Sequence, residues 1–497
     1  MQNRFIVVRN AVAATLWATS LARGADILVS TQTELTNALN AAHAGDSIVL
    51  KNGVWSNLNV NKQNLAGTPA APITIRAQTP GQVAITGPNY FFDVGGHDYV
   101  VTGLTFKDEN SNLKSIRFRG TNSRVYDNAV LMGGRYNQIT YDVQDNAANP
   151  TSSFDHNFMA GKQDRGTTMV LDLSLNAHIR NNYFGHRPTG GPSAQNNGWE
   201  TIRIGNSGIM ASSLFAQIEN NYFESAEGEA ETISDKTHDN VIRGNTFQRI
   251  RKGWVTGRHG GRGVYEDNYF IDAMGIRIGN AEDAIADHPG VTIRNNYMEG
   301  PNAKILFPGN QTTPNVYNNT VVVTAGAFAS NENTTGKYAF EYTNTTGGTV
   351  NDNVFTIGDN TYAAVQAGSL NSVAPTATGT GNFAYNSGTG GAFKSGTPAN
   401  IQAMFSTANP QLIRDSSGIL RPSATGPAAG KGFGGAAPLL SRKSDVGPAW
   451  LDSVMPPPCS FERGHGLPAD GQPCARRDRA GSLLRSCRRA LRRSTER

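Results

Sequence analysis

The length of 497 residues allows either one large core or two or three ordinary domains. The 55 glycines and a charged fraction of only 17% favour an all-β protein with many tight turns over a helical one. The net charge of +5 misleads, because residues 458–497 contribute +6 and residues 1–24 contribute +3. The body between them carries about −4, so the overall charge does not indicate a nucleic-acid partner.

Residues 1–24 are predicted to form a cleaved signal peptide. Arg4 and Arg9 give a positive start, an apolar run follows over residues 11–21, and residues 22–24 offer small side chains for the peptidase. The alternative is a membrane anchor, but this run is too short to span a bilayer. No later segment approaches 18 apolar residues. We therefore expect a secreted or periplasmic protein without a membrane span.

A short helix is predicted over residues 33–42, with Thr31 or Thr33 as its N-cap and Leu35 and Leu39 four residues apart. A strand follows over residues 46–51. A short amphipathic helix ahead of the first strands can cover the open end of a stacked core, so we expect this helix to cap the fold.

A pair of residues ending in Asn, usually followed by Phe or Tyr, recurs along the body. The second residue of the pair is Asn157, Asn182, Asn221, Asn245, Asn268, Asn296, Asn319 and Asn353. Most steps are 23 to 29 residues, and a short apolar strand precedes each pair. This period is typical of a solenoid, and one coil of a parallel β-helix takes about this many residues.

We expect Asn to serve this fold in two ways. It tolerates the left-handed backbone of a tight turn, and stacked Asn side chains can hydrogen-bond from coil to coil. A leucine-rich repeat lacks support because its leucine spacing is absent. An all-β sandwich with chance repeats remains the lesser alternative. The prediction is an all-β protein with a single parallel β-helix over residues 25–450, of which residues 410–450 form a C-terminal wrap.

Residues 451–497 differ from the rest in composition. This Arg-rich tail holds all three cysteines, so no disulfide framework is expected in the body. It could bind nucleic acid, but the abrupt change in Cys and Arg usage favours a disordered extension or translation past the natural end in a shifted frame.

The residues that indicate chemistry lie between Gly228 and Gly260. Glu229 and Glu231 are two residues apart, so in a strand their carboxylates would share a face. Two such carboxylates repel each other unless a cation lies between them, and oxygen ligands of this kind suit Ca²⁺. Lys236 and Arg258 follow in a locally basic stretch. A cation beside a Lys and an Arg is what chemistry on a polyanion requires.

An earlier segment, residues 197–205, is expected to stack on this stretch. Its Trp199–Ile202 echoes Ala230–Ile233 in sequence, and residues one coil apart lie about 4.8 Å from each other along the axis. Asn197 could then supply an amide oxygen to the same cation. The spacing predicts a calcium site formed by Asn197, Glu229 and Glu231.

These motifs resemble polysaccharide lyase family 6, the alginate lyase and chondroitinase B type. The resemblance is carried by residues 197–205, Gly228–Lys236 and Arg258–Gly260, and more weakly by residues 44–50. It implies a right-handed parallel β-helix and Ca²⁺-dependent β-elimination on an acidic polysaccharide, most often alginate. It also implies that Lys236 is the catalytic base and that Arg258 is the catalytic arginine.

The resemblance further implies that His259 contacts substrate. Arg262 and Arg277 could bind substrate carboxylates, although a surface role is open for each. Asp235 departs from the family pattern, where Asn is expected, and a carboxylate there could weaken the lysine as a base. Dermatan sulfate is the alternative substrate. A non-catalytic polysaccharide-binding β-helix, or a hydrolase using Glu229 and Glu231 as acid and base, are the alternative functions.

Overall fold

The computed structural model describes residues 24–107, 116–131, 139–145, 152–162, 165–187, 198–279, 290–308, 311–326, 336–343, 345–368, 375–435 and 446–451. The predicted signal peptide lies outside the described residues except for Gly24, and the predicted tail lies outside them except for Leu451. In the part of the chain that is described, no helix has the length and apolarity that a bilayer crossing requires.

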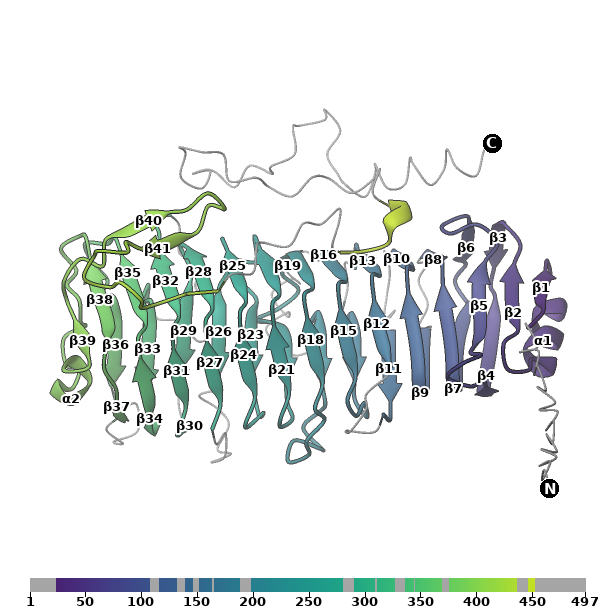
Figure 1. The fold of residues 1–497 in the computed structure, drawn as a ribbon, viewed down its shortest axis with the longest axis horizontal. Coiled ribbons are helices and arrows are strands. Elements are labelled where there is room, and N and C mark those ends of the chain that lie inside the picture. The colour runs from purple at the N-terminus through teal and green to yellow at the C-terminus, as the bar shows by residue number, and fades with distance from the viewer. Residues whose placement is uncertain are drawn as a thin grey trace, which may run out of the picture.

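The chain winds into a single right-handed parallel β-helix, which confirms the predicted fold class (Figure 1). Each coil places its strands beside those of the coils before and after it, so the strands form three long ladders. The first and second ladders belong to one 25-stranded sheet, because β7 (Phe91–Thr102) and β9 (Ile116–Tyr126) run through both. The third ladder is a separate 14-stranded sheet.

The remaining strands divide among these ladders as follows. The first ladder contains β4 (Asn59–Ala66), β11 (Ile139–Val143), β14 (Met169–Leu171), β17 (Ile202–Ile204), β20 (Glu231–Asp235), β23 (Trp254–Gly257), β26 (Gly275–Ile278), β29 (Lys304–Phe307), β33 (Phe340–Thr343) and β36 (Val365–Gly368). The second contains β1 (Asp26–Val29), β2 (Ser47–Leu50), β5 (Ile73–Ala77), β12 (Ser153–Asp155), β15 (His178–Arg180), β18 (Gln217–Glu219), β21 (Val241–Arg243), β24 (Val264–Glu266), β27 (Thr292–Arg294), β30 (Gln311–Thr312), β31 (Asn315–Tyr317), β34 (Thr345–Asn351) and β37 (Thr376–Thr378). The third contains β3 (Gly53–Ser56), β6 (Val83–Thr86), β8 (Leu104–Lys107), β10 (Ala129–Leu131), β13 (Phe158–Ala160), β16 (Tyr183–Arg187), β19 (Tyr222–Ala226), β22 (Thr246–Gln248), β25 (Tyr269–Ile271), β28 (Tyr297–Gly300), β32 (Thr320–Val323), β35 (Val354–Ile357), β38 (Asn382–Asn386) and β39 (Phe405–Ser406).

Short α-helices lie at both ends of the β-helix (Figure 1). At the N-terminal end, α1 (Gln32–Ala41) begins at Thr31, whose side chain accepts a hydrogen bond from the Glu34 amide at 3.2 Å. Its buried face, Leu35, Ala38 and Leu39, joins the main core. The predicted cap is therefore confirmed. The short α2 (Ala399–Gln402) lies at the other end.

The recurrent Asn residues form the ladder that the sequence predicts. Asn182, for example, donates from its backbone N and from Nδ2 to Asn221 Oδ1, at 2.9 and 3.0 Å, and also from Nδ2 to the Phe154 carbonyl at 2.8 Å. The left-handed backbone belongs to the residue before each of these Asn residues, such as Asn181 with φ 54° and Asn220 with φ 53°. One position turns the chain, and the next one links the coils.

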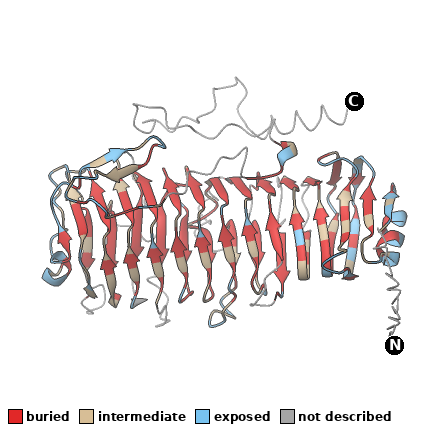
Figure 2. Ribbon diagram, viewed as in Figure 1, coloured by how far each residue is buried: buried red, intermediate tan, exposed pale blue. Residues whose placement is uncertain are grey.

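The interior is apolar along the whole axis, and Figure 2 shows the strands buried almost throughout. Aromatic side chains that follow the Asn ladder stack on one another: Phe184 on Phe223 and Phe223 on Phe247, with ring centroids 4.9 and 4.7 Å apart. These phenylalanines belong to the main core, whereas Tyr183 and Tyr222 on the third ladder pack in a separate cluster with Val446 and Leu451 of the C-terminal wrap.

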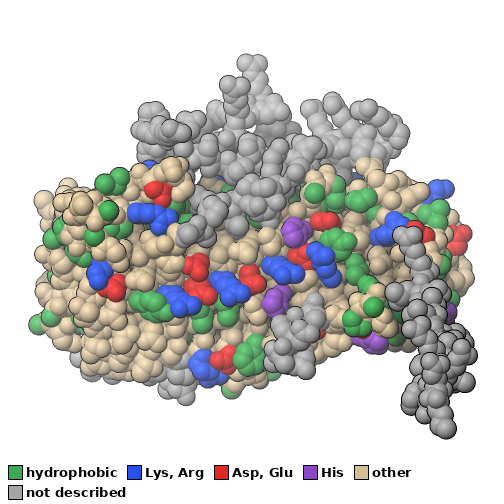
Figure 3. Space-filling model, viewed as in Figure 1, with side chains coloured by type: hydrophobic (Ala, Val, Ile, Leu, Met, Phe, Trp, Pro, Cys, Tyr) green, Lys and Arg blue, Asp and Glu red, His purple; other side chains and the backbone are tan. Residues whose placement is uncertain are grey.

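The predicted C-terminal wrap packs along the outer face of the third ladder. It includes the β40–β41 hairpin (Leu412–Arg414 and Leu420–Pro422) and the 3-10 helix η2 (Ala449–Leu451). The Phe433 amide donates to Thr320 Oγ1 at 2.8 Å, and Trp450 Nε1 donates to the Asp127 carbonyl at 2.9 Å. The outer face of the second ladder, in contrast, carries acidic and basic side chains that alternate across its middle (Figure 3). Arg124 with Asp155, at 2.6 Å, is one of these pairs.

Candidate functional site

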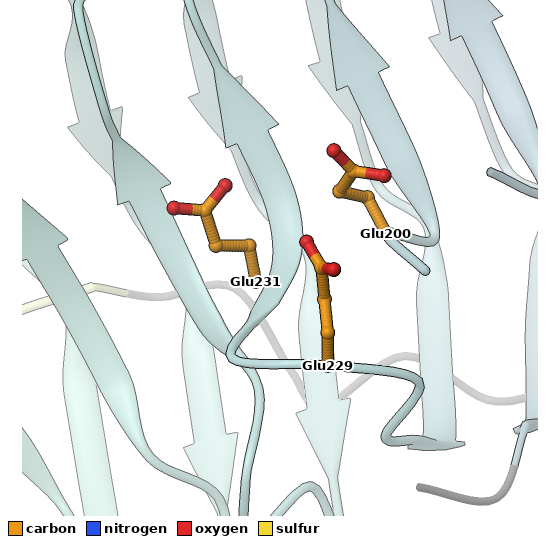
Figure 4. A group of neighbouring side chains, drawn as sticks. All are labelled: Glu200, Glu229 and Glu231. Carbon is orange, nitrogen blue, oxygen red and sulfur yellow. The ribbon is translucent and has the colours of Figure 1, made fainter. Parts of the chain in front are cut away.

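Three glutamates converge on two neighbouring coils of the first ladder (Figure 4). Glu200 lies two residues before the start of β17, Glu229 lies in the loop before β20, and Glu231 is the first residue of β20. Each offers one carboxylate oxygen, and these oxygens all lie within 4.8 Å of one another. All three side chains are buried. We call this group the acid cluster.

The predicted stacking of the two similar segments produces this cluster. Ile202 pairs with Ile233 in register, and the Thr201 amide donates to the Thr232 carbonyl at 3.0 Å. Glu200 therefore lies beside Glu231. Glu200 was not among the predicted site residues, although the similarity between Trp199–Ile202 and Ala230–Ile233 aligns Glu200 with Glu231 and could have indicated it. Asn197, which was predicted instead, lies outside the described residues.

The electrostatics of the acid cluster are unfavourable without a cation. Burial, followed by the charges of Glu200 and Glu231, raises the pKa of Glu229 to about 9. The opposing contribution is a hydrogen bond of 3.2 Å from the Trp199 amide. Glu231 Oε2 is buried and accepts no hydrogen bond from a described residue. Three carboxylates, one with a buried oxygen that accepts no hydrogen bond, form a set of ligands that suits a hard divalent cation.

Two basic side chains flank the acid cluster, as predicted. Lys236 Nζ lies 3.9 Å from Glu200 Oε1, and Arg258 Nη1 lies 3.8 Å from Glu231 Oε1. Lys236 follows the end of β20, and Arg258 follows the end of β23 on the next coil. The parallel register thus brings together groups that are 22 residues apart in sequence.

The predicted substrate-binding residues are placed differently from one another. Arg277, on β26, is buried and pairs directly with Glu231 Oε1. His259 is also buried, next to Arg258. Arg262 instead pairs with Asp239, Nη2 to Oδ2 at 2.6 Å, and also donates to Ser213 Oγ at 3.2 Å. Among the described residues, no contact joins Arg262 to the acid cluster.

Asp235 does not face Lys236, contrary to the concern raised by the sequence. Strand alternation turns its carboxylate into the core, where it accepts hydrogen bonds from Asn240 Nδ2 at 2.7 Å and from the Tyr265 hydroxyl at 3.0 Å. Burial raises the pKa of Asp235 to about 7. Its backbone carbonyl accepts from the Arg258 amide at 2.7 Å, so this residue ties together the ends of β20 and β23.

Arg187 supports the acid cluster from the preceding segment. Its Nη1 donates to the Glu200 carbonyl at 2.8 Å and to Thr168 Oγ1 at 3.0 Å. Thr167 Oγ1 donates to Glu200 Oε2 at 2.9 Å. A Cβ at Gly228 would lie 2.1 Å from the Trp199 carbonyl, so only glycine allows the Glu229 loop to approach this closely. The sequence analysis did not identify these supporting residues.

Comparison with known proteins gives an independent result. The family model described as chondroitinase B matches residues 29–333, which is more than half of the chain and includes the whole acid cluster. No curated protein matches the chain.

Solved structures of similar fold include alginate lyases. The structure named PL6 family alginate lyase AlyGC is 28% identical, with a TM-score of 0.66, and the match covers 87% of this chain and 60% of that one. The chain thus spans about 60% of the length of that lyase. The polysaccharide lyase Pedsa3628 from Pseudopedobacter saltans is 22% identical, with a TM-score of 0.57 over 85% of this chain and 99% of that one. The extent of the family match and this shared fold lead to one conclusion: the chain belongs to the chondroitinase B family, within polysaccharide lyase family 6.

Proposed function

We propose that this protein is a polyuronate lyase that cleaves alginate by β-elimination assisted by Ca²⁺. The observation that carries the proposal is the position of Lys236 and Arg258, each within 4 Å of a buried carboxylate of the acid cluster. The three carboxylates lie within 4.8 Å of one another, and the pKa of Glu229 is still raised to about 9 beside Lys236, Arg258 and Arg277. A group of acids that the basic side chains of the chain leave in this state suits a bound cation and an anionic substrate.

The residues of this chain can carry out the elimination as follows. Lys236, in its neutral form, takes the C5 proton of a uronate ring. The C4–O4 bond then breaks as the C4=C5 double bond forms, and water or a neighbouring side chain returns a proton to the leaving O4. Arg258 stabilises the negative charge that develops at the carboxylate and C5, because guanidinium hardly deprotonates. Arg277 holds Glu231 in place from the far side.

Glu200, Glu229 and Glu231 are the residues that would hold the metal, and Asn197 is proposed as a further ligand. Bound there, Ca²⁺ would neutralise the substrate carboxylate and so make the C5 proton more acidic. The oxygen-rich donor set and the raised pKa of Glu229 support this assignment.

Alginate is proposed as substrate because solved structures of similar fold include alginate lyases, one with an oligosaccharide named G6 and another with a trisaccharide. Dermatan sulfate is the second candidate, which the description of the matching family favours. Export of the protein remains a proposal that rests on the predicted signal peptide.

The test is ultraviolet absorbance of the unsaturated product, measured separately with polymannuronate, polyguluronate and dermatan sulfate. We expect absorbance to rise with alginate polymers, to stop after chelation and to return when Ca²⁺ is added. A rise with dermatan sulfate alone would replace alginate as the substrate. If absorbance rises with none of the three polymers when Ca²⁺ is present, a polysaccharide-binding protein would be the better interpretation.

A further inference from the structure

A row of outward-facing residues connects the acid cluster to a second feature on the first ladder. Residues in register along the ladder are Arg117, Thr140, Val170, Arg203, Ser234, Thr256 and Arg277. The neighbours of Arg117 on its strand, Ile116 and Phe118, point into the core, so the row points away from it. Arg117 and Arg203 are the partly exposed members of the row, and the other members are buried. Arginine thus recurs every third coil, and Lys236 lies between the second and third of them.

A cleft of about 620 Å³ opens beside this row, from the coil of Arg117 to the segment that follows β17. The described residues that line it include Arg117, Arg119, Asp142, Gln144, Leu173 and Leu214. Its lining combines charged and polar side chains with leucines, and Leu173 is 59% exposed there. Ligand sites commonly combine apolar walls with a few directed polar groups, and a sugar ring offers both kinds of surface.

Arg117 has spare capacity to bind an anion. Among the described residues its one partner is Asp93, with Nη1 3.7 Å from Oδ2, which is too long for a hydrogen bond. Asp93 is already held by Arg119, with Nε to Oδ1 at 3.1 Å and Nη2 to Oδ2 at 2.5 Å. Arg117 Nε is buried without a hydrogen bond. One aspartate thus serves two arginines, and the partly exposed guanidinium group of Arg117, which lines the cleft, suits a carboxylate.

We propose that the Arg117 cleft is a distal subsite that binds a uronate carboxylate of the same polymer chain whose bond is cleaved at Lys236. This proposal rests on the proposed function. β9 and β20 are four ladder steps apart, which places Arg117 ~19 Å along the axis from the strand that precedes Lys236, at ~4.8 Å per step. A uronate ring in an extended polymer is of comparable length to one step. A chain lying along the axis would pass Arg203, whose Nε also lacks a hydrogen bond and whose Nη2 is held by Asp172.

The subsite predicts an effect that depends on substrate length. For a size series of oligouronates, kcat/KM of the unmodified protein should increase steeply once the oligomer is long enough to span the cleft and Lys236. Arg117→Ala should lower kcat/KM for long oligomers about tenfold, the size of one lost charged hydrogen bond, and leave short oligomers unaffected. Arg124→Ala is the matched control, because Arg124 lies on the same strand but pairs with Asp155 on the second ladder.

A second variant separates lost binding from lost stability. Leu173→Asp places a negative charge on an exposed position of the cleft. It should therefore also lower kcat/KM for long oligomers and not for short ones, whereas Leu173→Asn should lower neither. Equal effects of Arg117→Ala on short and long oligomers, or no effect on either, would overturn the distal subsite while the lyase assignment stands. Complete absence of unsaturated product from the unmodified protein would instead overturn the proposed function, and this inference with it.

Discussion

The Asn ladder and the acid cluster are both sets of buried polar side chains on neighbouring coils, but their hydrogen bonding differs. In the Asn ladder each amide is matched: Asn245 Oδ1 accepts from the backbone N and Nδ2 of Asn221, at 2.9 and 3.1 Å, and Asn245 Nδ2 donates to the Ile218 carbonyl at 2.8 Å. In the acid cluster three acceptors face one another, and the pKa of Glu229 rises to about 9.

This difference separates structural from functional polar groups. A matched buried group stabilises the fold, whereas an unmatched one costs stability unless a ligand completes it. Substitutions in the Asn ladder should therefore lower stability and spare activity. Substitutions in the acid cluster and its flanks should lower activity or metal response and spare the metal-free fold.

The largest effect is expected for Lys236→Ala, which removes the proposed base. We expect the rate of product formation to fall by ~10²–10⁴-fold, the usual contribution of a general base, with an unchanged thermal midpoint. Lys236→Arg is the matched variant, because it keeps the charge but cannot accept the proton. If either variant keeps more than about a tenth of the activity, the base lies elsewhere.

Asp235→Asn tests the buried carboxylate behind Lys236. Its pKa is about 7 in the folded protein, raised by burial from the usual value of 3.8, so folding favours the protonated form. The stability from that proton is fully present below about pH 4 and is lost as pH rises through about pH 7. Asp235→Asn removes this dependence on pH. Relative to the original protein, the free energy of unfolding of the variant should therefore rise by up to roughly 4 kcal/mol between pH 4 and pH 7. Denaturation curves across this range would show it, and parallel pH profiles for the two proteins would contradict it.

Asn245→Ala tests the structural side of the comparison. It leaves the Asn221 amide and the Ile218 carbonyl without partners in the core, and should cost about 3 kcal/mol in the free energy of unfolding. The activity of the folded protein should persist, because Asn245 lies between β21 and β22, away from the first ladder. Asn409→Ala is the control: Asn409 is exposed and its side chain accepts one hydrogen bond, from the Gln411 amide at 2.9 Å, so the change should cost less than about 1.5 kcal/mol. Loss of activity without loss of stability would contradict the separation.

Glu229→Gln tests the acid cluster in the opposite sense. Calcium at a hundred times its dissociation constant should stabilise the original protein by about 2.7 kcal/mol, and the variant much less. Without calcium the variant should be as stable as the original, because Gln imitates the protonated carboxyl. Glu227→Gln is a matched control, since Glu227 lies outside the acid cluster and accepts from the Arg251 amide at 2.6 Å. Equal calcium-dependent shifts of the thermal midpoint in all three proteins would place the ion elsewhere.

The fold could be predicted because each coil repeats the same requirement. The Asn positions, the strand before each of them and the α1 cap are all local patterns, and the structure confirms them. The site was predicted only in part. Glu200 was missed because its role depends on which coils stack. Arg187 was missed because its partners, two backbone carbonyls and the Thr168 hydroxyl, lie on other segments that the sequence does not bring together. Asp235 was expected to weaken Lys236 as a base, but strand alternation turns adjacent side chains to opposite faces, and the Asp235 carboxylate is bonded to Asn240 and Tyr265.

The smallest effect distinguishes two arginines that the sequence could not separate. Arg262 pairs with Asp239 where both are partly exposed, with side-chain exposures of 48% and 21%, and such pairs contribute less than about 1 kcal/mol. Arg277 is buried against Glu231 and faces the same side as the acid cluster. Arg262→Ala should therefore leave both kcat and KM unchanged, while Arg277→Ala lowers activity and weakens the calcium response. An increase in KM for Arg262→Ala would show that substrate reaches the corner between the first and second ladders, and would extend the site beyond the face that carries Arg117 and Arg277.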